Sequence, residues 1–139
     1  MKRLALGKKA RLASILCALF MMCSMAISVS ARNVADYNLT MPRLGGKIYT
    51  SSIKKTGTTK AVNNNTSIGG GYTMHCAIYK ASDSSKMSST KSCGSGDRIL
   101  IPYNDASSAK GVNVKMGAWT SLTTGVKVQT SGSWSPDES

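Results

Sequence analysis

The chain has 139 residues, of which 41% are hydrophobic, and it carries 18 lysines and arginines against six acidic residues, a formal net charge of +12. One histidine and four cysteines leave few residues for a histidine-based catalytic triad or a zinc module. The first 31 residues are expected to be an N-terminal leader that is removed. The remaining 108 residues are enough for one domain and too few for two.

Residues 1–31 predict a cleavable secretory signal peptide. The first eleven positions hold five basic residues and no acidic one, and residues 12–29 are uncharged. In signal peptides a basic N-terminal part is followed by an apolar run and then by small residues at the cleavage site. We therefore expect an apolar helix, cleavage between Ala31 and Arg32, and secretion without a permanent membrane anchor.

Two alternatives to cleavage stay open, an uncleaved anchor and a lipoprotein. A membrane-spanning helix needs about 20 strongly apolar residues. The apolar run here is shorter and is diluted by Ser14, Ser24 and Ser28. Neither Cys17 nor Cys23 follows the small residue that normally precedes a lipidated cysteine, so both are interpreted as apolar filling of the leader.

The rest of the chain predicts short strands separated by turns. Apolar residues alternate with polar ones, and no window has the spacing of an amphipathic helix. Residues 32–46 are expected to form an extended N-terminal segment ahead of a β-rich domain over 47–136. Asn63, Asn64 and Asn65 belong to the stretch that looks least structured. The expected elements are a β-leaning run at 47–53, an edge strand or loop at 54–60, and strands at 72–81, 98–101, 111–119 and from 125.

The strand expected at 72–81 shows the clearest division into two faces. Met74, Cys76 and Ile78 share the side that should point into the core, and His75 and Tyr79 lie on the other side. Five or six such strands in one small domain predict an all-β fold, either an antiparallel sandwich or a small barrel, following the signal-peptide helix.

Two cysteines, Cys76 and Cys93, lie beyond the expected cleavage site. Two cysteines in an exported chain most often form one disulfide, and the loop between them is polar, so a cross-link would hold it in place. We therefore expect a Cys76–Cys93 disulfide. Two free thiols are the alternative, because many secreted proteins of Gram-positive bacteria avoid disulfides.

Catalytic and metal-binding signals are weak. His75 is the only histidine and lies within an expected strand, where a structural or surface role is the simpler interpretation. The acidic residues are scattered, and the cysteine and histidine spacing matches no zinc module. We expect no enzymatic activity, no cofactor and no metal.

Positive charge is the feature of the sequence that suggests a function. The 13 basic and six acidic residues beyond position 31 give a formal charge of +7. Lys47, Lys54, Lys55 and Lys60 cluster in the sequence and are the candidate contacts to anionic surfaces. Outside the cell such surfaces are wall polymers and lipid headgroups, whereas specific nucleic-acid binding is not expected. A solvated surface that only maintains solubility is the alternative.

Four segments within residues 35–138, taken in their order along the chain, carry a resemblance to a known family. They are the Asn63–Thr66 run, Tyr72-Thr73-Met74, residues 114–118, and the ending Gly-Ser-Trp-Ser-Pro-Asp-Glu at 132–138. In these the chain resembles a family of small secreted proteins of Gram-positive bacteria that has no assigned function. The resemblance implies a signal peptide and a β-rich mature part, and it implies no catalytic or binding residue. The secreted, Gly- and Asn-rich character is also loosely similar to bacteriocins of the lactococcin type.

Together these features predict a secreted, non-enzymatic protein that associates with the cell envelope or other anionic extracellular surfaces. A secreted bacteriocin is the first alternative, and an enzyme or enzyme inhibitor is the second. The sequence gives no oligomeric state.

Overall fold

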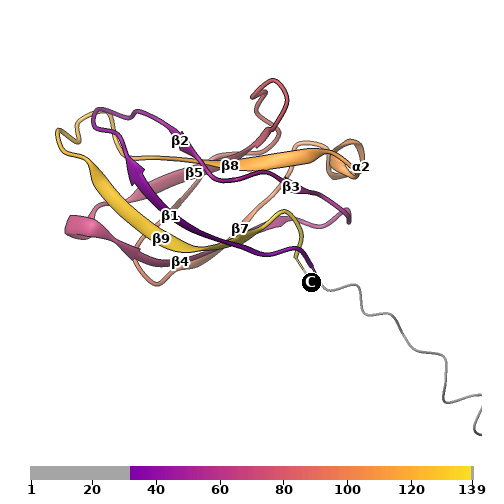
Figure 1. Ribbon diagram of the computed structural model, residues 1–139, viewed down its shortest axis with the longest axis horizontal. Helices are drawn as coiled ribbons and strands as arrows, with labels where there is room; N and C mark the ends of the chain where they lie inside the picture. The colour runs from indigo at the N-terminus through magenta and orange to yellow at the C-terminus, as the bar shows by residue number, and fades with distance from the viewer. Residues whose placement is uncertain (1–31, 139) are drawn as a thin grey trace, which may run out of the picture. The chain divides into compact units, whose positions relative to one another are not determined.

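The computed structural model describes residues 32–138, which fold into two antiparallel β-sheets (Figure 1). The predicted signal peptide and Ala31 lie outside the described residues. One sheet has the order β1-β9-β4-β7, and the other has the order β2-β8-β5-β6 with β3 also paired to β8. The strands are β1 (Ala35–Met41), β2 (Ile48–Tyr49), β3 (Ile53–Lys54), β4 (Ala61–Ile68), β5 (Met74–Lys80), β6 (Lys91–Cys93), β7 (Arg98–Ile101), β8 (Asn113–Trp119) and β9 (Val128–Ser135).

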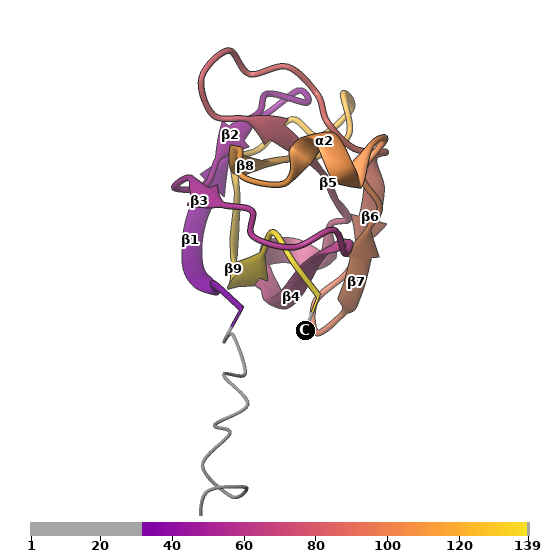
Figure 2. The ribbon, with the colours of Figure 1, turned by 90° about the vertical axis from the view of Figure 1, so that its right-hand side faces the viewer.

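The all-β antiparallel expectation is confirmed. Two short helical turns complete the described part, η1 (Gly69–Gly71) and α2 (Ala106–Ala109), and the Asp105 side chain caps α2. The two sheets face each other, and β6 and β7 lie side by side where one sheet passes into the other (Figure 2). Within residues 32–138 no helix has the length and apolar character needed to cross a membrane.

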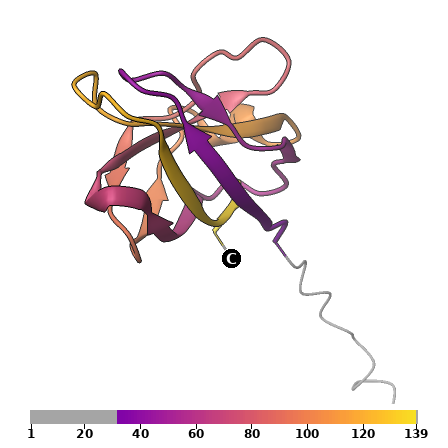
Figure 3. The ribbon, with the colours of Figure 1, turned by 60° about the vertical axis from the view of Figure 1, so that its left-hand side comes forward.

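The N-terminal segment is part of the sheet and does not precede the domain. β1 pairs with β9 from Ala35 opposite Trp134 to Met41 opposite Val128 (Figure 3). Tyr37, Leu39 and Met41 alternate inward along β1 and pack in the core. The expected boundary at residue 47 was therefore wrong, because the apolar alternation that makes a strand already begins at Tyr37.

The run expected at 47–53 is two short strands that both pair with β8. Tyr49 lies opposite Gly117 and Ile53 opposite Val114, so the edge has one residue more than β8 over this interval. Thr50 occupies the irregularity, and its hydroxyl accepts a hydrogen bond from the Met116 N–H at 3.0 Å. A side chain thus replaces a backbone partner that the bulge removes.

The asparagine run expected to be least structured lies inside β4. Asn63 and Asn65 point into the core, where Asn63 accepts from the Tyr37 hydroxyl at 2.8 Å and Asn65 donates to the Thr130 hydroxyl at 2.8 Å. Burial raises the pKa of Tyr37 to about 12, which keeps its phenol a hydrogen-bond donor. Asparagine is rare in strand interiors, but here each buried amide is fixed by a side-chain partner.

The core lies between the sheets and is rich in methionine. Met41, Met74, Met116 and Trp134 are among its largest fully buried side chains. Gly132, opposite Asn65, allows β9 to approach β4 closely, since a Cβ there would lie 2.3 Å from the Asn64 carbonyl oxygen. The glycine of the C-terminal motif therefore has a packing reason.

Candidate functional site

The outer face of the β2-β8-β5-β6 sheet carries aromatic and lysine side chains close together. Tyr79 on β5 lies opposite Lys115 on β8, and His75 lies opposite Trp119. Tyr49 on β2 lies opposite Gly117, between those two pairs. We call the group the basic aromatic face, and it comprises Lys47, Tyr49, His75, Tyr79, Lys115 and Trp119.

The rings of this face support its two ammonium groups. Lys47 Nζ lies 4.9 Å from the ring centre of Trp119 and 5.3 Å from that of Tyr79. Lys115 Nζ lies 4.3 Å from the ring centre of Tyr49, and Tyr49 meets Tyr79 edge to face at 5.4 Å. A ring face attracts a cation through its quadrupole, so both ammonium groups are held over the sheet.

The rings of Tyr79 and Tyr49 pack against Gly117, which has no side chain to displace them. A Cβ at this position would lie 2.7 Å from the Tyr79 ring and 3.1 Å from the Tyr49 ring. Tyr79 is 4% exposed although it points away from the core, and its hydroxyl has no hydrogen-bond partner in the described part of the chain. The phenol is thus buried under its neighbours on an outer face.

In the part of the chain that the structure describes, no carboxylate pairs with the lysines of this face. Among residues 32–138 the ion pairs within 4.0 Å are Lys55–Asp137 and Arg98–Glu138. Lys115 donates to the Ser84 hydroxyl at 2.7 Å, which leaves its charge in place. The face therefore carries two positive charges that have no countercharge among the described residues.

His75 joins this face to a groove at one end of the sheet. Its Nδ1 lies 2.7 Å from the Ser92 Oγ, and its ring centre is 6.2 Å from that of Trp119. Within the described residues its hydrogen-bond partner is this hydroxyl and not a carboxylate. A serine and a histidine are thus in contact without the acid that orients the base in a catalytic triad.

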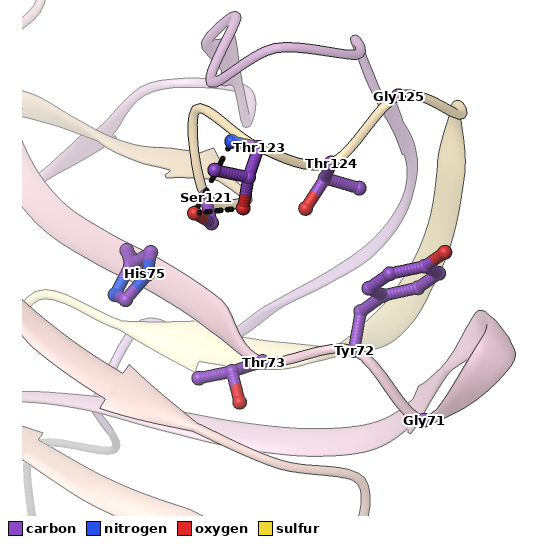
Figure 4. Close-up of a pocket in the computed structure, with 8 residues that line it drawn as sticks. All are labelled: Gly71, Tyr72, Thr73, His75, Ser121, Thr123, Thr124 and Gly125. Carbon is purple, nitrogen blue, oxygen red and sulfur yellow. Dashed lines mark hydrogen bonds between the residues drawn. The ribbon is translucent and has the colours of Figure 1, made fainter.

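The groove consists of two adjoining depressions of about 600 and about 380 Å³. Both include His75, Ser121 and Thr123; the larger also reaches Lys47 and Trp119. Figure 4 shows the β8–β9 loop with Ser121 and Thr123 on one side and β5 with His75 on the other. The lining of the groove combines hydroxyls, an imidazole, an indole and one ammonium group with the apolar side chains of Leu122 and Tyr72, so it offers both polar and apolar contacts.

The lysines predicted as surface contacts separate in the structure. Lys47 belongs to the basic aromatic face, and Lys54 and Lys60 are exposed outside it. Lys55 is fully buried, so its assignment as a surface contact was wrong. Its Nζ contacts Asp137 Oδ1 at 2.5 Å and donates to the carbonyl oxygens of Thr59 and Pro136.

The Lys55–Asp137 pair fastens the C-terminal tail to the loop after β3. Asp137 Oδ2 accepts from the backbone N–H groups of Thr56 and Gly57 at 2.8 and 3.1 Å. Desolvation alone would raise the pKa of Asp137, but the Lys55 ammonium and these N–H groups lower it below its ordinary value. The Tyr103 ring, whose centre is 4.3 Å from Lys55 Nζ, covers the pair.

The two cysteines are free thiols, which corrects the expected disulfide. Cys76 on β5 pairs with Lys91 and Cys93 on β6 pairs with Met74, so the cysteines are diagonal and not directly opposite neighbours. Both are buried, and the Asn63 amide points to their sulfurs at 4.0 and 3.7 Å. The hydrogen bond to Cys93 and burial raise the pKa of Cys76, which keeps that thiol protonated.

Within residues 32–138 no three cysteine, histidine or acidic side chains gather as metal ligands would. The sequence placed His75 and Tyr79 on the outer side of their strand. It did not bring Tyr49, Lys47 and Trp119 to them, because that needs the pairing of β2 with β8.

Comparison with family models, curated proteins and solved structures found no match to this chain.

Proposed function

We propose that this chain is a secreted, non-enzymatic binding protein that associates with anionic polymers of the cell wall through its basic aromatic face. The observation that carries the proposal is the pair Lys47 and Lys115, held against aromatic rings and free of carboxylate partners among residues 32–138. Charges that need no reorganisation before binding give up less entropy when an anion arrives.

The ligand class follows from the chemistry of the face. Phosphate or carboxylate groups spaced along a polymer would meet Lys47 and Lys115 together, while the hydroxyl-lined groove beyond His75 would accept polar groups of the same chain. An open groove suits an extended polymer that passes across it. The absence of a carboxylate partner for His75 in the described residues favours binding over hydrolysis.

The test is sedimentation of the purified protein with isolated cell walls, before and after chemical removal of their anionic polymers. Lys47→Gln with Lys115→Gln should weaken binding about tenfold, since two ionic contacts at the surface are lost. Raising the salt concentration should release the wild-type protein. Stripped walls should retain little of it.

The matched control is Lys60→Gln with Lys110→Gln, which removes the same charge from exposed positions outside the face. This control should bind as the wild type does. Equal binding by both double variants, or full retention on stripped walls, would contradict the proposal. Loss of binding in both variants would mean that total charge, and not the basic aromatic face, attracts the polymer.

A further inference from the structure

Four of the five exposed large hydrophobic side chains in residues 32–138 lie on three neighbouring loops. Leu44 is in the β1–β2 loop, Tyr72 follows η1, and Leu122 and Val126 are in the β8–β9 loop. The fifth, Val34, precedes β1 at the opposite end of that strand. We call Leu44, Tyr72, Leu122 and Val126 the apolar tip.

The loops of the tip are joined to each other. The Leu44 N–H donates to the Thr124 carbonyl oxygen at 2.7 Å, and Leu122 lies against Gly45, where an added Cβ would be 2.7 Å from Leu122 Cδ2. Tyr72 lines the same depression as Thr124 (Figure 4). The three loops, which are distant in the sequence, therefore lie at the same end of the sandwich (Figure 1).

Two of these side chains are exposed to a degree that folding alone does not explain. Leu122 is 77% exposed and Leu44 is 59% exposed. Leu44 also has a φ of 58°, a left-handed conformation that glycine or asparagine adopts more readily. A leucine that is neither buried nor conformationally favoured suggests a role in contact with another apolar phase.

The charges around the tip are of one sign. Arg43 precedes Leu44, Lys47 ends the same loop, and Lys127 follows Val126. None of the three loops, residues 42–47, 69–73 and 120–127, contains an acidic residue. Apolar side chains ringed by basic ones match the boundary between acyl chains and anionic headgroups in a bilayer.

We infer that the apolar tip inserts into the interface of an anionic lipid membrane, with Arg43, Lys47 and Lys127 against the headgroups. The tip adjoins the proposed wall-binding surface, because Lys47 and Leu122 both line the larger depression. Wall binding depends on the lysines of the basic aromatic face, whereas membrane insertion depends on the apolar side chains of the tip. We favour a lipid surface over a protein as the partner. The exposed apolar side chains of the tip are accompanied only by positive charges, and the three loops contain no acidic or amide side chain that would give a protein partner a specific orientation.

The experiment measures co-sedimentation of the purified protein with phosphatidylglycerol and phosphatidylcholine vesicles. The wild-type protein should bind phosphatidylglycerol vesicles, which are anionic, at least tenfold more tightly than phosphatidylcholine vesicles. The double change Leu122→Ser with Val126→Ser should reduce the affinity for phosphatidylglycerol vesicles about tenfold or more. Val34→Ser is the matched control, an exposed valine away from the tip, and should change nothing. Residues 1–31 are identical in all variants, so any lipid affinity of that segment cancels in the comparison.

A second readout reports insertion directly. Leu122→Trp places an indole at the tip. The emission that it adds to that of Trp119 and Trp134, obtained as the difference from the wild-type spectrum, should shift to shorter wavelength with phosphatidylglycerol vesicles and should shift less with wall polymers. An unshifted emission, or equal vesicle binding by the serine variant and Val34→Ser, would overturn the inference and leave wall binding untouched. A dimer that becomes monomeric in the serine variant, with vesicle binding unchanged, would identify the tip as a self-association surface and also overturn it.

Discussion

The lysines of the outer face and the lysine beneath the C-terminal tail carry the same charge in opposite surroundings. Lys47 is exposed and Lys115 is half-buried, and each lies over an aromatic ring without a carboxylate partner in residues 32–138. Lys55 has no exposed surface and directs its ammonium group to two carbonyl oxygens and the Asp137 carboxylate. The difference teaches that a lysine's neighbours, and not its presence in a basic run, decide whether its charge stays available at the surface or holds the fold.

The contrast is sharpest between adjacent residues. Lys54 ends β3 and is exposed, while Lys55 turns inward under Tyr103. Removing an ammonium group from water is costly, and only a complete set of partners offsets it. The tail residues supply most of that set, since Pro136 and Asp137 provide two of the three acceptors and the Thr59 carbonyl oxygen provides the third.

The largest effect is expected when Lys55 is replaced by Met. The variant keeps a long apolar side chain but leaves the Asp137 carboxylate buried without its counter-charge. Breaking a buried pair in this way costs about 3–5 kcal/mol of unfolding free energy. Urea denaturation followed by tryptophan fluorescence measures it, because Trp134 on β9 lies in the core two residues before Pro136.

Lys54→Met is the matched control for that change. Its side chain is exposed, so the unfolding free energy should stay within about 0.5 kcal/mol of the wild-type value. A Lys55→Met protein as stable as Lys54→Met would show that the buried pair does not hold the tail. The comparison between the two kinds of lysine would then lose its physical basis.

A smaller effect is expected on acidification, which removes one charge of the pair and keeps the atoms in place. The folded-state pKa of Asp137 is lowered below its unfolded value of about 3.9. Its contribution to stability is therefore complete above that value and is lost as the pH falls through the lower folded pKa. Unfolding free energy measured by urea titration between about pH 5 and pH 2 should decline more steeply in the wild type than in Asp137→Asn.

Asp105→Asn serves as the control for acidification. Asp105 also has a lowered pKa, through the N–H and hydroxyl groups of Ser108 and the N–H of Ser107, but it is an exposed helix cap. Its replacement should leave most of the acid dependence in place. An acid slope that persists in Asp137→Asn and disappears in Asp105→Asn would assign it to the cap.

Strand positions were the part of the fold most open to prediction. β7 was expected at residues 98–101 and lies there, and the inward Met74, Cys76 and Ile78 of β5 were assigned correctly, because alternation is a local signal. The buried Asn63 and Asn65 were missed, since their partners Tyr37 and Thr130 come from other strands. Local propensity treats an asparagine run as a loop, and tertiary hydrogen bonds override it.

The candidate site was predictable only in part, for the same reason. Lys47 was singled out from a basic run, but its neighbours Tyr79 and Trp119 come from β5 and β8. Lys55 looked equivalent to Lys47 because its partner Asp137 is 82 positions away. The apolar tip has no periodic pattern at all, since it is assembled from single residues on three loops.

The smallest effect on stability is expected for the lysines of the outer face. Lys47→Gln and Lys115→Gln each remove a partly solvated cation–ring contact, which is worth about 0.5–1 kcal/mol at exposed positions. Glutamine retains about half of the apolar stem of lysine, which still covers part of the ring, so urea unfolding should detect less than about 1 kcal/mol for either change. Both variants should nevertheless bind cell walls less tightly than the wild type, which would separate a role in binding from a role in stability. A loss comparable with that of Lys55→Met would mean that these lysines also hold the fold, because the aromatic rings beneath them would then depend on their cover.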